Sequence, residues 1–121
     1  MSSHTFQARV REWTAACFPP SVQGDVKERT HRFLEEAIEL AQASNCTRED
    51  ALALIDYVFS RPEGEPFQEA GGVLVTLAAL CNAQEMDMDL AGEHELSRNW
   101  SRIDKIRAKQ AAKPQGSALP Q

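Results

Sequence analysis

The sequence predicts an all-α protein built as a bundle of four to five helices. Good helix formers, chiefly Ala, Leu, Glu, Arg and Gln, are plentiful along the chain. The β-branched and aromatic residues are not gathered into the alternating runs that mark strands, whereas several segments repeat apolar residues at helical spacing. We therefore expect helices with short connections and no strands of consequence.

Two helices are expected in the first part of the chain. The first has one apolar stripe at helical spacing, made of Phe6, Val10, Trp13 and Cys17. The run Phe18-Pro19-Pro20 should end it, because proline cannot continue a helix. After a turn through Gly24, the second helix is predicted at about residues 26–44, ending near Asn45.

Three more helices should follow, at about residues 48–60, 66–84 and 90–111. Thr47 and Asp50 form a variant capping box for the third helix, and the fourth opens with a proline, which suits a first turn. The fourth helix is apolar almost all round. A helix without a polar face is normally buried on every side, so we expect it at the centre of the bundle or at a subunit interface.

With 121 residues, the chain has the length of one domain, which we place at residues 1–112. The tail, residues 113–121, has little to bury and is expected to be flexible. No apolar stretch reaches the roughly 20 residues that cross a bilayer, and residues 1–9 lack an apolar signal core. These observations predict a cytoplasmic protein that does not bind membranes.

The charge argues against a general nucleic-acid binder. The net charge is −5, whereas such proteins normally present a basic surface that releases counterions. Basic residues do gather near the end of the chain, where six of them stand between positions 98 and 113 with one acid, Asp104. The odd number of cysteines, without zinc-ligand spacing, predicts reduced thiols at Cys17, Cys46 and Cys81.

Acidic residues mark the candidate site. The second predicted helix carries Glu35-Glu36-Ala37-Ile38-Glu39, and Glu69 lies at the head of the fourth. Carboxylates three apart share one side of a helix, so Glu36 and Glu39 can hold one cation together. A hard cation such as Mg²⁺ prefers oxygen ligands and often keeps substrate phosphates in its shell, which points to phosphate chemistry. A helical projection at about 100° per residue places Glu36 nearest the apolar face of this helix and Glu35 farthest from that face. The plainer alternative is a solvated acidic face, together with a first-turn acid that complements a helix dipole.

The pattern Glu-Glu-x-x-Glu on one helix, followed by a separate helix that opens with Glu, resembles the signature of the MazG-like all-α nucleoside triphosphate pyrophosphatases. Residues 29–36, 64–73 and 100–114 are also similar to short single-domain members of that family. The resemblance implies an enzyme of nucleotide-pool housekeeping that uses Mg²⁺, with Mn²⁺ as an alternative, to hydrolyse a nucleoside triphosphate to the monophosphate and pyrophosphate. It also implies a bundle completed by dimerisation, as a homodimer or homotetramer.

Carried over residue by residue, the resemblance assigns Glu36, Glu39 and Glu69 as metal ligands and Glu35 as a supporting acid or base. One ligand is missing, because the family's second motif is Glu-x-x-Asp and this chain has Gly72 in place of the Asp. Three acids can still form a Mg²⁺ site, with weaker binding. The two successive glycines at this point also suggest that a helix or a ligand approaches the backbone closely. Replacements for the lost oxygen could come from Asp56, Asp87 or Asp89.

Three basic residues are candidate phosphate contacts. Arg107 lies near the apolar side of the last predicted helix and, with Lys105, could reach a triphosphate. Arg32 stands one turn before the acids. The base preference stays open.

Two other functions fit parts of the pattern. Glu28 and His31 form a Glu-x-x-His unit of the kind that di-iron bundles carry, but those bundles need a second copy, which the chain lacks. With Gly72 in the Asp position, the chain could instead keep the bundle without turnover. It would then act as a nucleotide-binding or dimeric interaction module.

Overall fold

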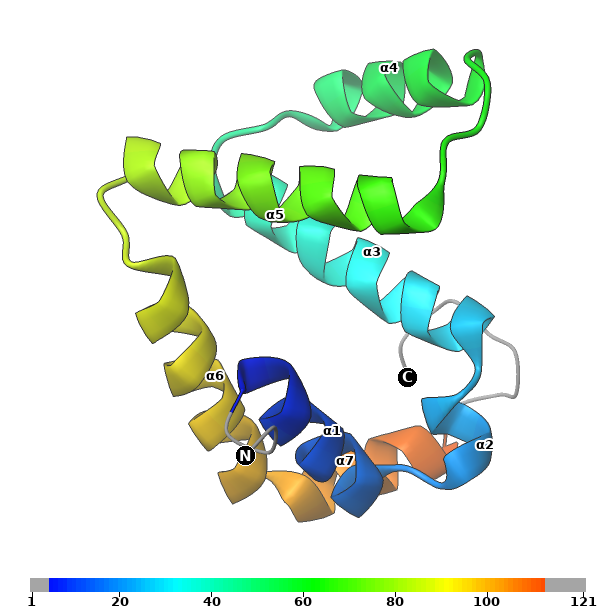
Figure 1. Ribbon diagram of the computed structural model, residues 1–121, viewed down its shortest axis with the longest axis vertical. Coiled ribbons are helices and arrows are strands. Elements are labelled where there is room, and N and C mark those ends of the chain that lie inside the picture. Colours follow the sequence, from blue (N-terminus) through cyan, green and yellow to red (C-terminus); the bar gives the residue numbers. More distant parts are fainter. Residues whose placement is uncertain (1–4, 113–121) are drawn as a thin grey trace. The chain divides into compact units, whose positions relative to one another are not determined.

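The structure is a computed structural model that describes residues 5–112 of the chain. Within that range it contains seven α-helices and no strand, so the all-α prediction is confirmed (Figure 1). The chain divides into two compact units. Unit 1 comprises residues 1–33 and 89–121, and unit 2 comprises residues 34–88. The predicted tail, residues 113–121, lies outside the described residues.

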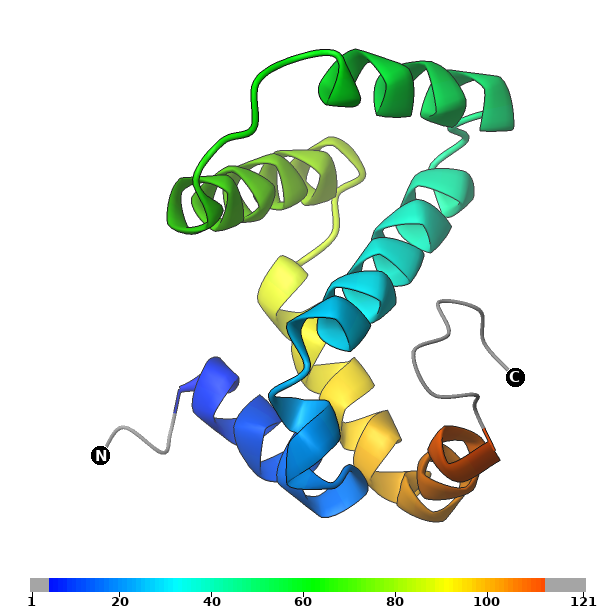
Figure 2. The ribbon, with the colours of Figure 1, turned by 90° about the vertical axis from the view of Figure 1, so that its right-hand side faces the viewer.

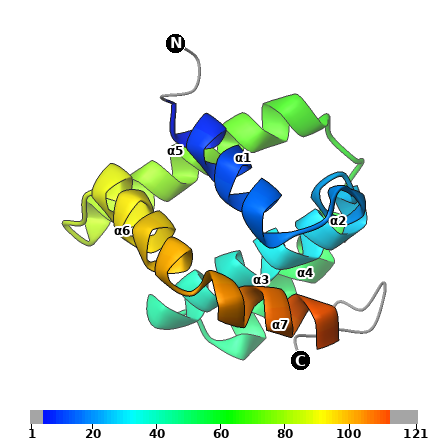
Figure 3. The ribbon, with the colours of Figure 1, turned by 90° about the horizontal axis from the view of Figure 1, so that it is seen from below.

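Unit 1 is built around α1 (Phe6–Cys17), which packs against α2 (Pro20–Gln23) and α7 (Ile103–Ala112) (Figure 3). The Thr5 hydroxyl caps α1 by accepting a 3.0 Å hydrogen bond from the backbone N–H of Ala8. The single turn of α2 was not predicted, although its first residue is a proline, as helix starts favour. The start of α3 (Val26–Ala43) and nearly all of α6 (Met88–Ser101) complete the unit.

Aromatic and arginine side chains contact one another in unit 1. The rings of Trp13 and Phe18 meet edge to face at 5.8 Å, and the guanidinium of Arg29 lies 4.8 Å from the centre of the Phe18 ring. Cys17 and Leu96 are buried. The end of α1 therefore holds several side chains in fixed mutual contact.

The prediction of one helix over residues 90–111 is wrong, because α6 ends at Ser101 and α7 begins at Ile103. The hydroxyl of Ser101 donates a 2.7 Å hydrogen bond to the carbonyl of Arg98, which is the acceptor that a continuous helix would give to the N–H of Arg102. That N–H bonds instead to the Asn99 carbonyl at 3.1 Å, which tightens the turn and interrupts the helix.

Unit 2 contains the second part of α3 together with α4 (Arg48–Phe59) and α5 (Pro66–Ala83). The loop at residues 60–65 joins α4 to α5 (Figure 2). Their bounds agree with the predicted ones to within a residue or two. The Thr47 hydroxyl caps α4 by accepting from the N–H of Asp50 at 3.1 Å, as the capping box predicts. The predicted end of the second helix is also confirmed: Asn45 has φ 71°, the left-handed conformation that often closes a helix.

Unit 2 has almost no core of its own. Throughout residues 34–88, all of which the structure describes, Cys81 alone is buried. Thirteen large apolar side chains of this unit are exposed, against five among the described residues of unit 1. Within unit 2, α5 is therefore not the centre of a bundle, and its place at a subunit interface stays a prediction. No helix in residues 5–112 combines the length and apolar character needed to cross a bilayer.

Candidate functional site

The first candidate acids lie on α3. Asp25 caps this helix, since its carboxylate accepts from the backbone N–H of Glu28 at 3.1 Å. Glu36 and Glu39 are exposed, whereas Glu35 is half-buried. The predicted order, with Glu36 drawn inward and Glu35 farthest out, is wrong for this structure. The prediction assumed that other helices cover the apolar face of α3. In the structure that face is about half exposed, at Phe33, Leu34 and Ile38.

Glu69 stands in the first turn of α5, where a carboxylate also complements the helix dipole. The cap of this helix is Glu65, whose carboxylate oxygens accept from the N–H groups of Phe67 and Gln68 at 3.0 and 3.1 Å. The carboxylate of Glu69 is exposed and lies against the backbone of Gly64, so closely that a β-carbon at position 64 would overlap it. A side chain at position 64 would therefore displace the Glu69 carboxylate from the place it occupies here.

The structure does not gather three metal ligands. Among residues 5–112, no group of three or more His, Cys, Asp or Glu side chains is placed to hold a metal ion. The set Glu36, Glu39 and Glu69 therefore stays a prediction for an assembly or a ligand-bound state. The acids suggested as replacements for the missing Asp are all exposed, at Asp56, Asp87 and Asp89.

The two glycines of α5 face open space. A β-carbon at Gly71 or Gly72 would meet no atom of the described residues within 4 Å. The close approach that we expected here is therefore not found within that part of the chain. An aspartate at position 72 would fit without a clash.

The candidate phosphate contacts belong to unit 1. Arg32 is half-buried and its Nε lies 3.4 Å from a carboxylate oxygen of Glu28. Arg107 donates from Nε and Nη2 to the Ala16 carbonyl, at 2.8 and 2.5 Å, and so caps the last turn of α1. Lys105 is exposed. Of the three, Arg107 already has a structural role.

The two units carry opposite charge. Unit 2 has eleven carboxylates and two arginines, a formal charge of −9, and it contains the three assigned metal ligands Glu36, Glu39 and Glu69. Unit 1 has eleven basic and seven acidic residues, a formal charge of +4 with histidines neutral. The chain's modest net charge of −5 conceals this separation.

Sequence reasoning missed a paired charge in unit 1. Arg9 of α1 donates to both carboxylate oxygens of Glu93 on α6, at 2.7 and 2.5 Å. This hydrogen bonding lowers the pKa of Glu93 and raises the pKa of Arg9. The pair lines a shallow hollow of about 360 Å³ with Trp100 and Leu96. Its residues stand 84 positions apart, so no local pattern could have indicated it.

Arg29 was also missed as a buried charge. Burial lowers the pKa of its guanidinium. Its Nε, like the indole N–H of Trp13, is buried and has no hydrogen-bond acceptor among residues 5–112. The Arg29 guanidinium instead makes a cation–π contact with the face of the Phe18 ring. The sequence signal was weak, since Arg29 lies in a mostly polar turn of the predicted helix.

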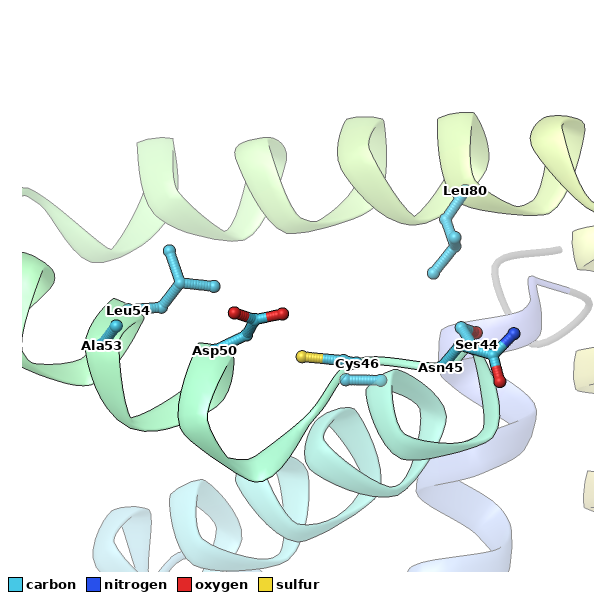
Figure 4. Close-up of a pocket in the computed structure, with 8 residues that line it drawn as sticks. Ser44, Asn45, Cys46, Asp50, Ala53, Leu54 and Leu80 are labelled. Carbon is cyan, nitrogen blue, oxygen red and sulfur yellow. The ribbon is translucent and has the colours of Figure 1, made fainter.

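A second hollow, of about 650 Å³, lies in unit 2 between the end of α3, the start of α4 and Leu80 of α5 (Figure 4). Its lining is mainly apolar. Asp50 is the one charged residue among the lining residues, and the Cys46 thiol points toward it (Figure 4). The three cysteines are free, in agreement with the prediction of reduced thiols.

Comparison of the chain with protein-family models, with curated proteins and with solved structures gives no match.

Proposed function

We propose that this chain is a Mg²⁺-dependent nucleoside triphosphate pyrophosphohydrolase, which cleaves a nucleotide between its α and β phosphates to give a monophosphate and pyrophosphate. The observation that carries the proposal is the position of Glu36 and Glu39, three residues apart on α3, in the same strongly acidic unit as Glu69. The proposal includes assembly into a homodimer or homotetramer that completes a helical bundle.

The carboxylate pair suits Mg²⁺, which is commonly held by one or two protein carboxylates together with substrate phosphates. When bound, the cation would neutralise phosphate charge and make a bound water more acidic. Glu36 and Glu39 would hold the ion, Glu69 would add an oxygen from a second helix, and the half-buried Glu35 would orient the attacking water. No residue of the set needs to form a covalent intermediate.

Pyrophosphate release tests the proposal directly. The full chain is incubated with a panel of canonical and modified triphosphates, with Mg²⁺ and with a chelator. Glu39→Gln should lower kcat/KM by at least about 100-fold, or about 2.7 kcal/mol of transition-state stabilisation. The matched control is Glu49→Gln, another exposed acid of unit 2 outside the candidate set, which should stay within about twofold. Turnover that needs neither the metal nor Glu39 would contradict the proposal.

A second function is favoured by the absence of a three-ligand group among residues 5–112 and by Gly72. The chain would then bind nucleotides, or a partner copy, without hydrolysing them. Saturable nucleotide binding by calorimetry, with no pyrophosphate released from any substrate, would support it.

Gly72→Asp tests whether position 72 faces the candidate metal site. Position 72 is open to a side chain, and glycine is a poor helix former, so the variant should fold at least as well as the native chain. If position 72 faces the site, Mg²⁺ should bind on the order of tenfold more tightly by calorimetry. Unchanged affinity in a folded variant would show that this position faces elsewhere.

A further inference from the structure

Two buried hydrogen-bond donors border the Phe18 ring in unit 1. The Arg29 guanidinium lies 4.8 Å from the centre of that ring, and the ring of Trp13 meets it edge to face at 5.8 Å. The Nε of Arg29 and the indole Nε1 of Trp13 are buried, and neither has an acceptor among residues 5–112. Buried donors are normally hydrogen-bonded, because bulk water no longer reaches them. Two such donors beside one ring indicate that a bound group supplies the acceptor.

The acids nearest Arg29 do not supply it. The carboxylate of Asp25 caps α3 by accepting a 3.1 Å hydrogen bond from the backbone N–H of Glu28. The carboxylate of Glu28 lies 3.4 Å from the Nε of Arg32. Both acids attract Arg29 electrostatically, but within residues 5–112 neither forms an ion pair with it. The hydrogen-bonding capacity of Arg29 is therefore unused in this part of the chain.

Arg29 also differs from the other arginines of unit 1 that contact the protein. The Nε of Arg102 is buried without an acceptor too, but Nη2 of that residue donates to the side-chain oxygen of Asn99 at 2.9 Å. Arg107 donates to the carbonyl of Ala16. Arg29 is held by an aromatic face, which fixes a guanidinium without using any of its five N–H donors.

We propose that unit 1 binds a phosphate group at the Arg29 guanidinium, with the indole N–H of Trp13 as a second donor. The planar guanidinium matches the spacing of two phosphate oxygens. A phosphate suits the site better than a water molecule, because water would accept the hydrogen bonds without neutralising the cation. The formal charge of +4 on unit 1 also favours an anion. The inference does not rest on the proposed function, since neither residue belongs to its candidate set.

Partial burial makes Arg29 a better anion ligand than an exposed arginine. Burial lowers its pKa, Arg32 adds to this lowering, and Glu28 and Asp25 oppose it. A bound phosphate would act as a counter-ion and offset the cost of keeping this cation partly out of water. Solvent also screens the attraction less at a half-buried group. Because Arg29 is half-buried and not enclosed, an anion can approach it from solvent.

The test is titration calorimetry of the full chain in EDTA, with inorganic phosphate, pyrophosphate or a nucleoside monophosphate as the ligand. At least one of them should bind with a Kd below about 1 mM, and the tightest identifies the source of the phosphate group. Arg29→Met should weaken this binding at least about tenfold, and Trp13→Phe, which keeps a ring and removes the donor, about threefold. Arg11→Met is the matched control, because it removes an exposed charge of the same unit, and its Kd should stay within about twofold.

Two results would overturn the inference. One is a Kd above about 1 mM for all three ligands, and the other is an Arg29→Met variant that binds as the native chain does. If Arg29→Met loses helicity by circular dichroism, Arg29→Lys decides, because lysine keeps the charge and lacks the planar fork. That variant should weaken binding about fivefold, and unchanged binding would also overturn the inference.

The same samples separate this inference from the proposed function and from a packing role. A native chain that binds phosphate in EDTA but releases no pyrophosphate from any substrate contradicts catalysis alone. Turnover by a chain whose Arg29→Met variant binds phosphate normally contradicts the phosphate site alone. If Arg29 served only to pack on Phe18, Arg29→Met would lower the melting temperature without ligand and leave the phosphate affinity unchanged.

Discussion

Units 1 and 2 are both helical, but they differ in what their side chains contact. In unit 1, Arg9, Arg29 and Arg107 each lie against another element, and Trp13 packs on Phe18. In unit 2 the helices have good caps and exposed apolar faces. The comparison shows that the signals that form a helix are separate from those that pack it. Capping residues and the spacing of apolar residues are sufficient to form a helix. Packing that helix needs an apolar surface opposite it, which unit 2 does not contain.

The largest expected effect contrasts a buried leucine in unit 1 with an exposed one in unit 2. Leu96→Ala should lower the free energy of unfolding by about 2–5 kcal/mol, because Leu96 is 7% exposed and its loss leaves a cavity. Leu74→Ala, at 60% exposure, should cost less than about 1 kcal/mol in dilute solution and more as the protein concentration rises. Urea denaturation at two protein concentrations measures both. Equal costs at the lower concentration would show that unit 2 has a core within one chain.

Thiol labelling compares the units at single residues. Burial raises the pKa of Cys17, which leaves little of the reactive thiolate, so this residue should react slowest with iodoacetamide. Cys46 is half-exposed and should react first. Cys81 is buried in the unit that we expect to be completed by a partner, and its labelling should accelerate on dilution, as measured by peptide mass spectrometry. A labelling rate of Cys81 that does not depend on protein concentration would contradict this expectation. As a control, the three cysteines should react at equal rates in urea, where the protein is unfolded.

The two threonine caps are a matched pair. Thr5 caps α1 and Thr47 caps α4 through the same side-chain oxygen, at 3.0 and 3.1 Å. Thr5→Ala should cost about 1 kcal/mol of unfolding free energy at every protein concentration. Thr47→Ala should cost a similar amount only where unit 2 is associated, because α4 contributes little to the stability of a lone chain. Thermal melts of both variants over a series of protein concentrations measure this difference. If Thr5→Ala and Thr47→Ala depend on protein concentration in the same way, the expected difference between units 1 and 2 does not exist.

The smallest effect concerns the ion pair between Arg9 and Glu93. The pKa of Glu93 is lowered from its ordinary value of 4.5, so the pair stabilises the folded state above that pH, and this contribution is lost as the pH falls through the lowered pKa. Arg9→Gln should therefore reduce stability slightly at pH 7, and this effect should shrink progressively as the pH falls below 4.5. Arg11→Gln, an exposed arginine of the same helix, is the control. A loss of stability that persists unchanged at pH 3 would mean that Arg9 acts through packing.

Much of the local structure could be predicted because its causes are local. Thr47 and the proline at position 66 mark helix starts within a few residues, and Asn45 marks an end. The break between α6 and α7 was missed because a hydroxyl that bonds the carbonyl three residues earlier, as Ser101 does, is not a sufficient signal for a break: Thr14 makes the same bond inside the continuous helix α1.

The candidate site was harder to predict because it depends on what covers each helix. The spacing of Glu36 and Glu39 could be read from the sequence, but their exposure depends on a surface opposite the apolar arc of α3. Arg107 shows the same limit. Its charge suggested a phosphate contact, whereas its guanidinium donates a hydrogen bond to the carbonyl of Ala16, 91 residues earlier in the chain. Contacts over such separations follow from packing, which no local pattern contains.

The contact between Gly64 and Glu69 has a consequence for engineering. Gly64 has no functional group, yet the space it leaves empty is the space that the Glu69 carboxylate occupies. Any other amino acid there would shift that acid while leaving it chemically intact. A mutagenesis campaign that scans only reactive side chains would overlook this position, and a loop library built on residues 60–65 should hold it fixed.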